Sequence, residues 1–305
     1  MSYKQNSPLP DPTSESGFVK VTAFSTCQFQ CPASFAIEGL PGTLFSDSYR
    51  FLIQHEATKT TLWFDFGVSS EPSIYPPHIQ SAQQKIYNLI PGKNTPADDA
   101  KSVGVDPTDV KYIVASHAHW DHIFPGGKYH PNATILCGRG TLDWASSMWP
   151  QVKDSTFDAH VWDPKLRDLP VEELKSPQEA PEEYQQVGPF KNCRDFFGDG
   201  SFWIVDAPGH CPGNLAGLAR VKDKTGKTKW VFFGGDCFHC HHFVHHPEAP
   251  FGKGVKVTPN DTFHDDHEKA REIIRQVADL KKGEGEDALI WIAHVDTLEG
   301  VWTMQ

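Results

Sequence analysis

Short apolar runs separated by polar turns recur along most of the chain, and their spacing predicts β-strands. Alternating or continuous apolar and β-branched residues mark strands at 18–26, 48–55, 60–66, 110–115, 134–137, 201–206, 215–221, 230–233 and 289–293. We expect the first three to pair antiparallel. Helical spacing is clearest over 264–280, where Ala270, Ile273, Ile274, Val277 and Leu280 would form one apolar stripe. Weaker patterns predict helices at 79–89 and 139–148.

The order of these elements predicts the fold class. Strands, helix and strand are followed by a second series of strands, helix and strand, which indicates two β-rich halves with helices outside. We therefore expect an α/β protein with four layers in an αββα sandwich. With 305 residues, a single domain over 17–305 is expected after a flexible tail at 1–16. The Pro-, Glu- and Gln-rich segment at about 150–191 is interpreted as a surface insertion.

Composition and charge limit the classes of molecule that we expect the protein to bind. With 28 Lys and Arg against 39 Asp and Glu, the net charge is −11, which disfavours binding to nucleic acid. No apolar run is long enough to cross a membrane, and no signal peptide is recognised. Seven cysteines, an odd number, favour reduced thiols and hence a cytoplasmic protein. A small molecule is the expected substrate, and the oligomeric state stays open.

The strongest chemical signal is the run from Ser116 to His122. His117, His119 and His122, together with the carboxylate of Asp121, follow directly after an apolar strand. Residues two apart on an extended chain point to the same side, so His117 and His119 would face one point. Imidazole nitrogens and carboxylate oxygens are ligands that zinc binds at roughly 2.0–2.2 Å. The run contains no cysteine and so does not predict a thiolate zinc site.

Three further candidate ligands stand where later predicted strands end, namely His210, Asp236 and His294. Together with the run they make seven candidate ligands, too many for one tetrahedral zinc ion. Two Zn²⁺ ions are therefore expected, although Mn, Fe or Co also accept nitrogen and oxygen donors.

This ordered pattern resembles the metallo-β-lactamase-fold superfamily over about residues 18–300. The matching positions are His117-X-His119-X-Asp121-His122, His210, Asp236 and His294, and the segment 64–67 resembles the family's first motif. The resemblance implies that His117, His119 and His210 hold one ion, and that Asp121, His122 and His294 hold the second. It further implies that Asp236 bridges the two ions and that Asp65 supports the site from behind.

Within the superfamily, the chain is most similar to the dizinc lactonase and lactamase branch. This similarity implies a dinuclear zinc hydrolase that opens a small cyclic ester or amide, with a hydroxide shared by the two ions as nucleophile. Asp121 would orient that hydroxide and carry its proton to the leaving group. An acyl-thioester hydrolase similar to glyoxalase II is the first alternative, and an iron-dependent sulfur dioxygenase is the second.

One departure from that branch concerns the pocket. Many such lactonases carry Tyr three positions after the bridging Asp, whereas this chain has His239, a catalytic candidate that can donate the same hydrogen bond or add metal affinity. Trp120 and His242 are expected to contact the pocket. Cys237 and Cys240, with the histidines up to His246, could form an extra metal site or a redox pair. Without a second cysteine pair at zinc spacing, pocket lining or helix capping is favoured.

Overall fold

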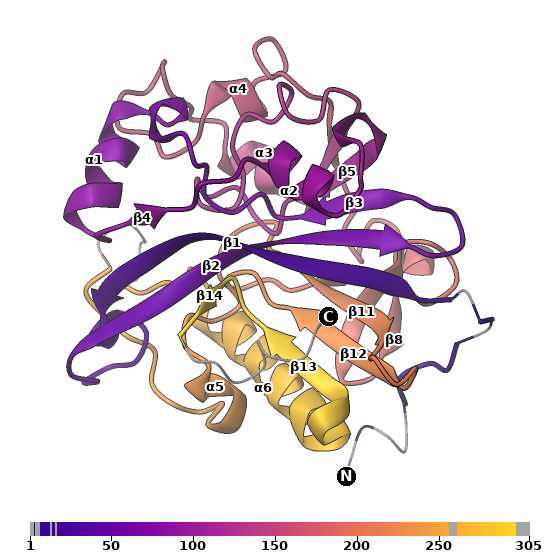
Figure 1. The fold of residues 1–305 in the computed structure, drawn as a ribbon. Helices are drawn as coiled ribbons and strands as arrows, with labels where there is room; N and C mark the ends of the chain where they lie inside the picture. Colours follow the sequence, from indigo (N-terminus) through magenta and orange to yellow (C-terminus); the bar gives the residue numbers. More distant parts are fainter. Residues whose placement is uncertain (1–2, 4–6, 13, 16, 256–260, 297–305) are drawn as a thin grey trace.

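Two β-sheets packed face to face form the centre of the molecule (Figure 1). The computed structural model describes residues 3, 7–12, 14–15, 17–255 and 261–296. Phe51 and Phe64 of one sheet meet Phe202 and Phe233 of the other in the core between them, and the rings of Phe51 and Phe233 lie 4.7 Å apart. In the described ranges, no helix combines the length and apolarity that a membrane span needs.

The first sheet has eight strands in the order β4-β1-β2-β3-β5-β6-β7, with β14 paired to β2. Their bounds are β1 Val19–Pro32, β2 Thr43–His55, β3 Thr61–Phe64, β4 Ile90–Pro91, β5 Val110–Val114, β6 Thr134–Cys137, β7 Val171–Glu173 and β14 His294–Val295. β3 is antiparallel to β2, as expected, and parallel to β5. It is buried along its whole length, which explains its continuous apolar sequence.

The second sheet has six strands in the order β13-β12-β11-β10-β9-β8. Their bounds are β8 Gln185–Val187, β9 Phe190–Asp195, β10 Phe202–Asp206, β11 Leu215–Lys222, β12 Thr228–Phe233 and β13 Ala288–Trp291. All pairs are antiparallel except β12 with β13. The chain then returns to the first sheet through β14, which joins the two halves.

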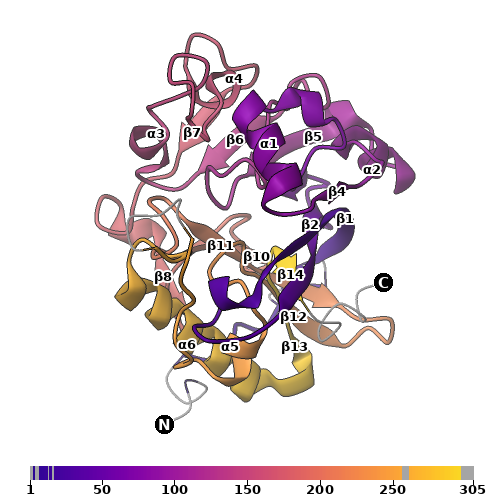
Figure 2. The same cartoon turned by 90° about the vertical axis from the view of Figure 1, so that its left-hand side faces the viewer.

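Helices cover the two outer faces and complete the αββα sandwich (Figure 2). Over the first sheet lie α1 Pro77–Lys85, α2 Pro96–Ser102, α3 Thr141–Trp144 and α4 Ala159–Trp162; over the second lie α5 His242–His245 and α6 His267–Glu284. The predicted apolar stripe of α6 is buried against the second sheet. The Asp266 side chain accepts a hydrogen bond from the Lys269 amide and so begins this helix. The fold class predicted from the sequence is confirmed.

The segment 150–191 is more than a surface insertion, which corrects that interpretation. Within it, β7 extends the first sheet and β8 extends the second, while Val161 and Trp162 are buried in the core under the first sheet. The two strands are short and lie at sheet edges, where polar and charged residues are normal. Their sequence therefore lacks the apolar pattern by which strands are recognised.

The expected flexible tail also needs correction where it is described. Leu9 packs against the core beneath the second sheet. The buried Arg220 guanidinium donates hydrogen bonds to the carbonyls of Pro10 and Gly17. A buried cation needs such acceptors, so this part of the tail belongs to the domain. Residues 1–2, 4–6, 13 and 16 lie outside the described residues.

Candidate metal centre

The candidate ligands come together at one edge of the sandwich because they follow the carboxyl ends of strands in both sheets. Asp65 follows β3, the 117–122 loop follows β5, His210 follows β10, Asp236 and His239 follow β12, and His294 begins β14. The sequence placed the 117–122 run, His210, Asp236 and His294 after predicted strands, whereas Asp65 lay within the predicted strand 60–66. The structure shows that these strand ends face one another across the two sheets.

Glycine is required beside two of the candidate ligands. Gly209, directly before His210, has φ +134°, and a Cβ there would lie 2.3 Å from the Ala270 amide nitrogen of α6. Gly235, directly before Asp236, has φ +47°, and a Cβ there would lie 2.8 Å from Ser116. Any larger residue would push these loops away from the cluster. The two glycines thus set how closely the ligand loops approach.

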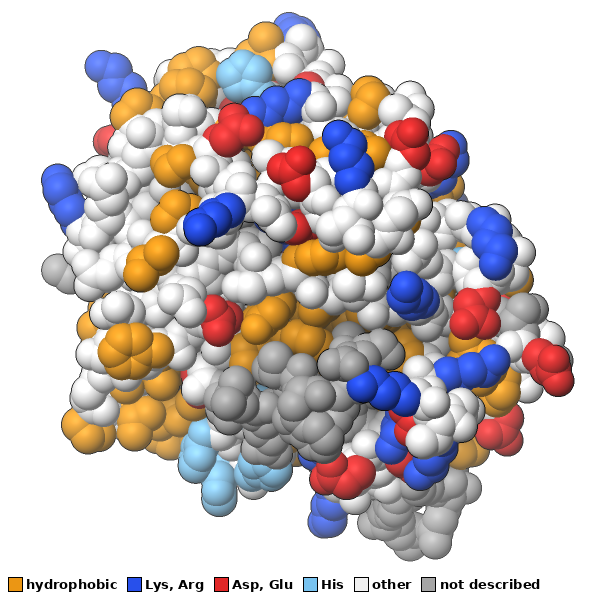
Figure 3. Space-filling view, in the orientation of Figure 1, with side chains coloured by type: hydrophobic (Ala, Val, Ile, Leu, Met, Phe, Trp, Pro, Cys, Tyr) orange, Lys and Arg blue, Asp and Glu red, His pale blue; other side chains and the backbone are white. Residues whose placement is uncertain are grey.

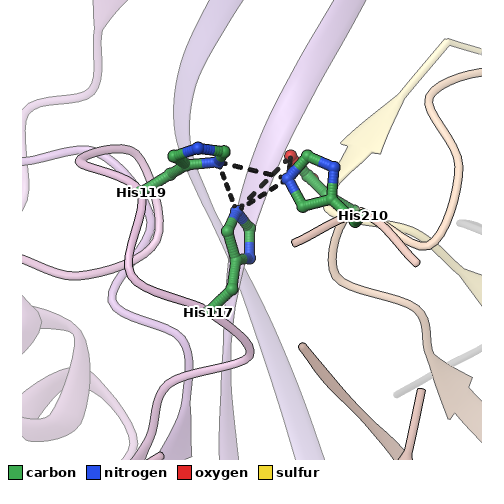
Figure 4. Close-up of side chains that lie close together, drawn as sticks. His117, His119 and His210 are labelled. Carbon is green, nitrogen blue, oxygen red and sulfur yellow. Dashed lines mark hydrogen bonds and ion pairs between the residues drawn. The ribbon is translucent and has the colours of Figure 1, made fainter. Parts of the chain in front are cut away.

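Three imidazoles form the first group of the centre (Figure 4). His117 Nε2 lies 2.8 Å from His119 Nδ1. His210 Nε2 lies 3.2 Å from His117 Nε2 and 3.1 Å from His119 Nδ1. The Oδ2 atom of Asp236 lies 3.6 Å from His210 Nε2 and 3.8 Å from His117 Nε2. Four donor atoms therefore surround one point.

Asp121, His122 and His294 form the second group. His294 Nε2 lies 3.4 Å from Asp121 Oδ2. The Oδ1 atom of Asp236 lies 3.2 Å from His122 Nε2 and also 3.2 Å from His294 Nε2. One oxygen of Asp236 thus faces each group, which places its carboxylate between them.

In three ligand rings, the nitrogen that faces away from the cluster contacts a neighbouring polar group. His210 Nδ1 donates to the Phe263 carbonyl at 2.6 Å, which leaves Nε2 free to act as a ligand. His122 Nδ1 lies 2.8 Å from Asp65 Oδ2. Ser116 Oγ lies 3.0 Å from His117 Nδ1 and 2.8 Å from Asp65 Oδ2. These contacts fix the orientation of three ligand rings.

Burial and the crowding of like groups shape the charges of the cluster. Burial, reinforced by the neighbouring imidazoles, holds the pKa of His117 well below its usual value. Burial also lowers the pKa of His210 far below its usual value, despite Asp236. Burial opposes ionisation of Asp236 too, but the His122 and His294 imidazoles outweigh it and hold the pKa of Asp236 well below the ordinary range. Burial lowers the pKa of His122 and His294, but the Asp236 carboxylate outweighs it and raises the pKa of His122 well above its usual value and that of His294 to about 9. Neutral imidazoles and an ionised carboxylate are the forms that bind metal, so a bound ion would displace the protons of these two rings.

These residues fit a pair of divalent cations. Ligands bound at about 2.0–2.2 Å around one tetrahedral ion lie roughly 3–4 Å from one another, and the candidate ligand atoms of each group all lie within 4.8 Å of one another. His122 Nε2 and Asp236 Oδ1 are buried without a hydrogen bond, although buried polar atoms are rarely left so. A cation between them would satisfy both atoms.

A cavity of about 420 Å³ opens onto the cluster. His119, Asp121, His210, Asp236 and His294 lie in its wall. Around them stand six aromatic residues, namely Phe29, Tyr87, Trp120, Trp144, Phe157 and Phe263. An apolar cavity with a few convergent polar groups is typical of a small-molecule site.

Of the three predicted pocket residues, two line the cavity and one does not. Trp120 and His239 line the cavity. His239 Nε2 lies 3.0 Å from Asp236 Oδ2, and its ring stacks on Phe263 at 3.9 Å. The expectation for His242 is wrong, because its side chain is exposed and takes no part in the cavity wall. It lies on the outer face of α5, while Phe243 and Val244 are buried against the second sheet.

The cysteine pair shows no sign of a metal or redox site. Cys237 and Cys240 are free and buried thiols, and burial raises the pKa of each to about 12. Little thiolate forms at neutral pH under these conditions. Cys237 accepts a hydrogen bond from Asn214, and Cys240 contacts the Asp296 carboxylate.

Some residues of the site carry no signal in the sequence. Phe29, Tyr87 and Phe263 belong to segments far apart in the chain and meet only in the folded protein. His78, from α1, also lines the cavity. Ser116 could have been noticed, because it directly precedes the ligand run and its hydroxyl reaches two of the ligand rings.

Several proteins are similar in sequence to much of this chain. The profile of the Metallo-beta-lactamase superfamily matches residues 79–189. Metallo-hydrolase mfmC of Annulohypoxylon moriforme is 28% identical over 85% of this chain and 72% of its own length. Gamma-lactamase FDB1 of Fusarium pseudograminearum is 30% identical, over 75% of this chain and 54% of its own. N-acyl homoserine lactonase AttM of Agrobacterium fabrum is 30% identical, over 56% and 59%. The chain thus spans little more than half the length of the last two.

Solved structures share the fold. AiiA of B. thuringiensis, with N-decanoyl-L-homoserine at its active site, is 18% identical with a TM-score of 0.59, over 91% of this chain and 94% of its own. AidC, a dizinc quorum-quenching lactonase, is 14% identical with a TM-score of 0.52, over 92% and 89%. With the αββα sandwich, these findings show that the chain has the metallo-beta-lactamase fold, and the match over residues 79–189 shows its similarity to that superfamily.

Proposed function

We propose that this protein is a metal-dependent hydrolase that opens small cyclic esters or amides, as lactonases and γ-lactamases do. The observation that carries the proposal is the convergence of seven nitrogen and oxygen ligands, five of which lie in the wall of an apolar cavity. The names of its relatives support the substrate class, because one is a gamma-lactamase and another an N-acyl homoserine lactonase.

Each of the two groups of ligands would hold one ion. His117, His119 and His210 would hold one, Asp121, His122 and His294 the other, with Asp236 between them. We infer zinc, because these nitrogen and oxygen donors and their spacing suit it, and a dizinc lactonase shares the fold. When bound, such ions activate a water molecule and polarise the carbonyl of the substrate.

Asp121 is suited to hold and move a proton. Its carboxylate is half-buried in the cavity wall, and its Oδ2 atom lies 3.4 Å from His294 Nε2. A carboxylate at this place can accept a proton from the attacking water and pass it to the leaving oxygen or nitrogen. The ring opens when that atom leaves with the proton.

His239 is suited to stabilise the charge that develops on the carbonyl oxygen. Its ring is 8% exposed and fixed between Phe263 and Asp236. A fixed N–H donor beside the reacting carbonyl stabilises the transition state more than the substrate. Nε2, the ring nitrogen beside Asp236, would supply that donor, because Nδ1 is buried. The aromatic walls exclude water and contact the apolar part of the substrate.

The proposal also covers the cellular location of the protein and the molecules that it binds. All seven cysteines are free thiols, which supports a reducing, cytoplasmic environment. A small molecule is the partner that the size of the cavity favours, and nucleic acid is not expected to bind the acidic chain.

A panel of small lactones and lactams tests the proposal, with an acyl-thioester as counter-screen. We expect ring opening of at least one lactone, measured by proton release, or of at least one lactam, measured by chromatography. Release of free thiol from the acyl-thioester without any ring opening would contradict the proposal and favour a thioester hydrolase.

A further inference from the structure

A second group of imidazoles lies on the surface at α5, outside the cavity. His242, His245 and His246 are exposed, and none belongs to the cavity wall. In the space-filling view, pale-blue side chains gather at the lower edge of the molecule, beneath α5 in the ribbon view (Figures 1 and 3). The sequence had singled out this run, but the proposed hydrolysis does not use it.

The backbone presents these side chains on one face. Positions i, i+3 and i+4 of a helical turn are neighbours, and the three histidines have this spacing. α5 ends at His245, but the amide of His246 still donates to the His242 carbonyl at 2.9 Å, which continues the helical spacing by one residue. The rings of His242 and His246 stack with centroids 4.2 Å apart and planes at 25°.

The charge state of His242 suits a metal ligand. Burial, together with the nearby imidazoles of His246 and His245, lowers the pKa of His242. The ring is then neutral at physiological pH and keeps a nitrogen lone pair available. The opposite face of the turn, with Phe243 and Val244, is packed into the core and holds the backbone in place.

We propose that His242, His245 and His246 form a separate cation site that takes a divalent ion of the zinc and copper group. Two histidines four positions apart on one helical face are an arrangement that binds zinc in other proteins, and imidazole suits zinc and copper. Rotation of these exposed side chains would bring three nitrogens to one ion. The site is independent of the seven-ligand centre and of its proposed function.

Zinc content tests this site directly. The full chain is equilibrated with Zn²⁺ near neutral pH, freed of unbound metal and analysed by mass spectrometry. His242→Ala/His246→Ala should bind about one ion per chain fewer than the unchanged protein, with an unchanged hydrolysis rate. His160→Ala removes an exposed histidine elsewhere and should leave the zinc content unchanged. Because the two substituted side chains are exposed, folding should be retained.

Equal zinc content in the double variant and the unchanged protein would overturn the proposal. An equal loss in His160→Ala would also overturn it, since any surface histidine would then suffice. A loss of zinc accompanied by a loss of hydrolysis would show that the two sites are not separate. The readout is metal content, so the result does not depend on whether a lactone or lactam is found to react.

Discussion

Asp65 Oδ2 lies 2.8 Å from His122 Nδ1, so a residue that binds no substrate orients a candidate ligand. The Oδ1 atom of the same carboxylate accepts the Ser116 amide at 2.7 Å. Asp65 follows β3, whereas Ser116 and His122 follow β5. The carboxylate therefore ties the ligand loop to the neighbouring strand and selects Nε2 of His122 as the metal-binding atom.

Asp65→Asn should weaken metal binding about 10- to 100-fold, because an amide orients His122 less well than a carboxylate. Asp65 has φ +56°, a conformation that Asn tolerates, so the backbone should be kept. Chelator competition measures the affinity. Asp168→Asn, which alters a carboxylate bound to the Gly127 amide outside the site, serves as control. Equal affinities in all three proteins would contradict this role.

His239→Phe should lower kcat about 100-fold, the effect of removing one oxyanion donor. The Phe ring keeps the stacking on Phe263 but donates no hydrogen bond. His239→Tyr restores a donor and should recover most of the rate. Steady-state kinetics and metal content are measured for both variants. An unchanged kcat in His239→Phe would refute a catalytic role, whereas a loss of bound metal in both variants would make His239 a ligand.

The ligands could be predicted from the sequence because four are consecutive or nearly so and the others follow recognisable apolar strands. The placement of His242 could not, since adjacent positions of a helix point about 100° apart, so His242 faces outward while its neighbour Phe243 is buried. β7 and β8 were missed because edge strands are polar. The aromatic wall was missed because Phe29, Tyr87 and Phe263 have no common sequence pattern and meet only through the fold.

The buried ion pair of Arg50 and Asp99 supports the first sheet from its outer side. Arg50 Nε lies 3.3 Å from Asp99 Oδ2, and both side chains are almost fully buried. Asp99→Ala should reduce the free energy of unfolding by about 3–5 kcal/mol, because it leaves a buried guanidinium without its partner. Arg50→Met/Asp99→Leu should regain most of that loss. Urea unfolding measures both, and a single-variant loss below about 1 kcal/mol would contradict the account.

Asp206, at the end of β10, should make stability fall as pH rises. Burial raises the pKa of its carboxyl group to about 6, above the value of an unfolded chain. The neutral form therefore stabilises the fold below about pH 4, and this contribution is lost as pH rises through about 6.

Asp206→Asn should consequently raise the free energy of unfolding at neutral pH, by at most about 3 kcal/mol, with a gain that shrinks toward about pH 4. Urea unfolding at several pH values tests this expectation. Asp223→Asn is the control, since its exposed carboxylate accepts from the Thr225 and Lys227 amides and should give no gain. A gain for Asp206→Asn that does not change with pH would contradict the assignment.

The central claim is that the residues from His117 to His294 hold two metal ions that this protein needs to open a cyclic ester or amide. The most direct measurement is turnover of a reactive lactone or lactam by chelator-treated protein as Zn²⁺ is added back. We predict that activity is lost on demetallation and returns in proportion to added zinc, reaching its maximum at about two ions per chain bound to the candidate ligands. Full activity in thoroughly demetallated protein would contradict the claim.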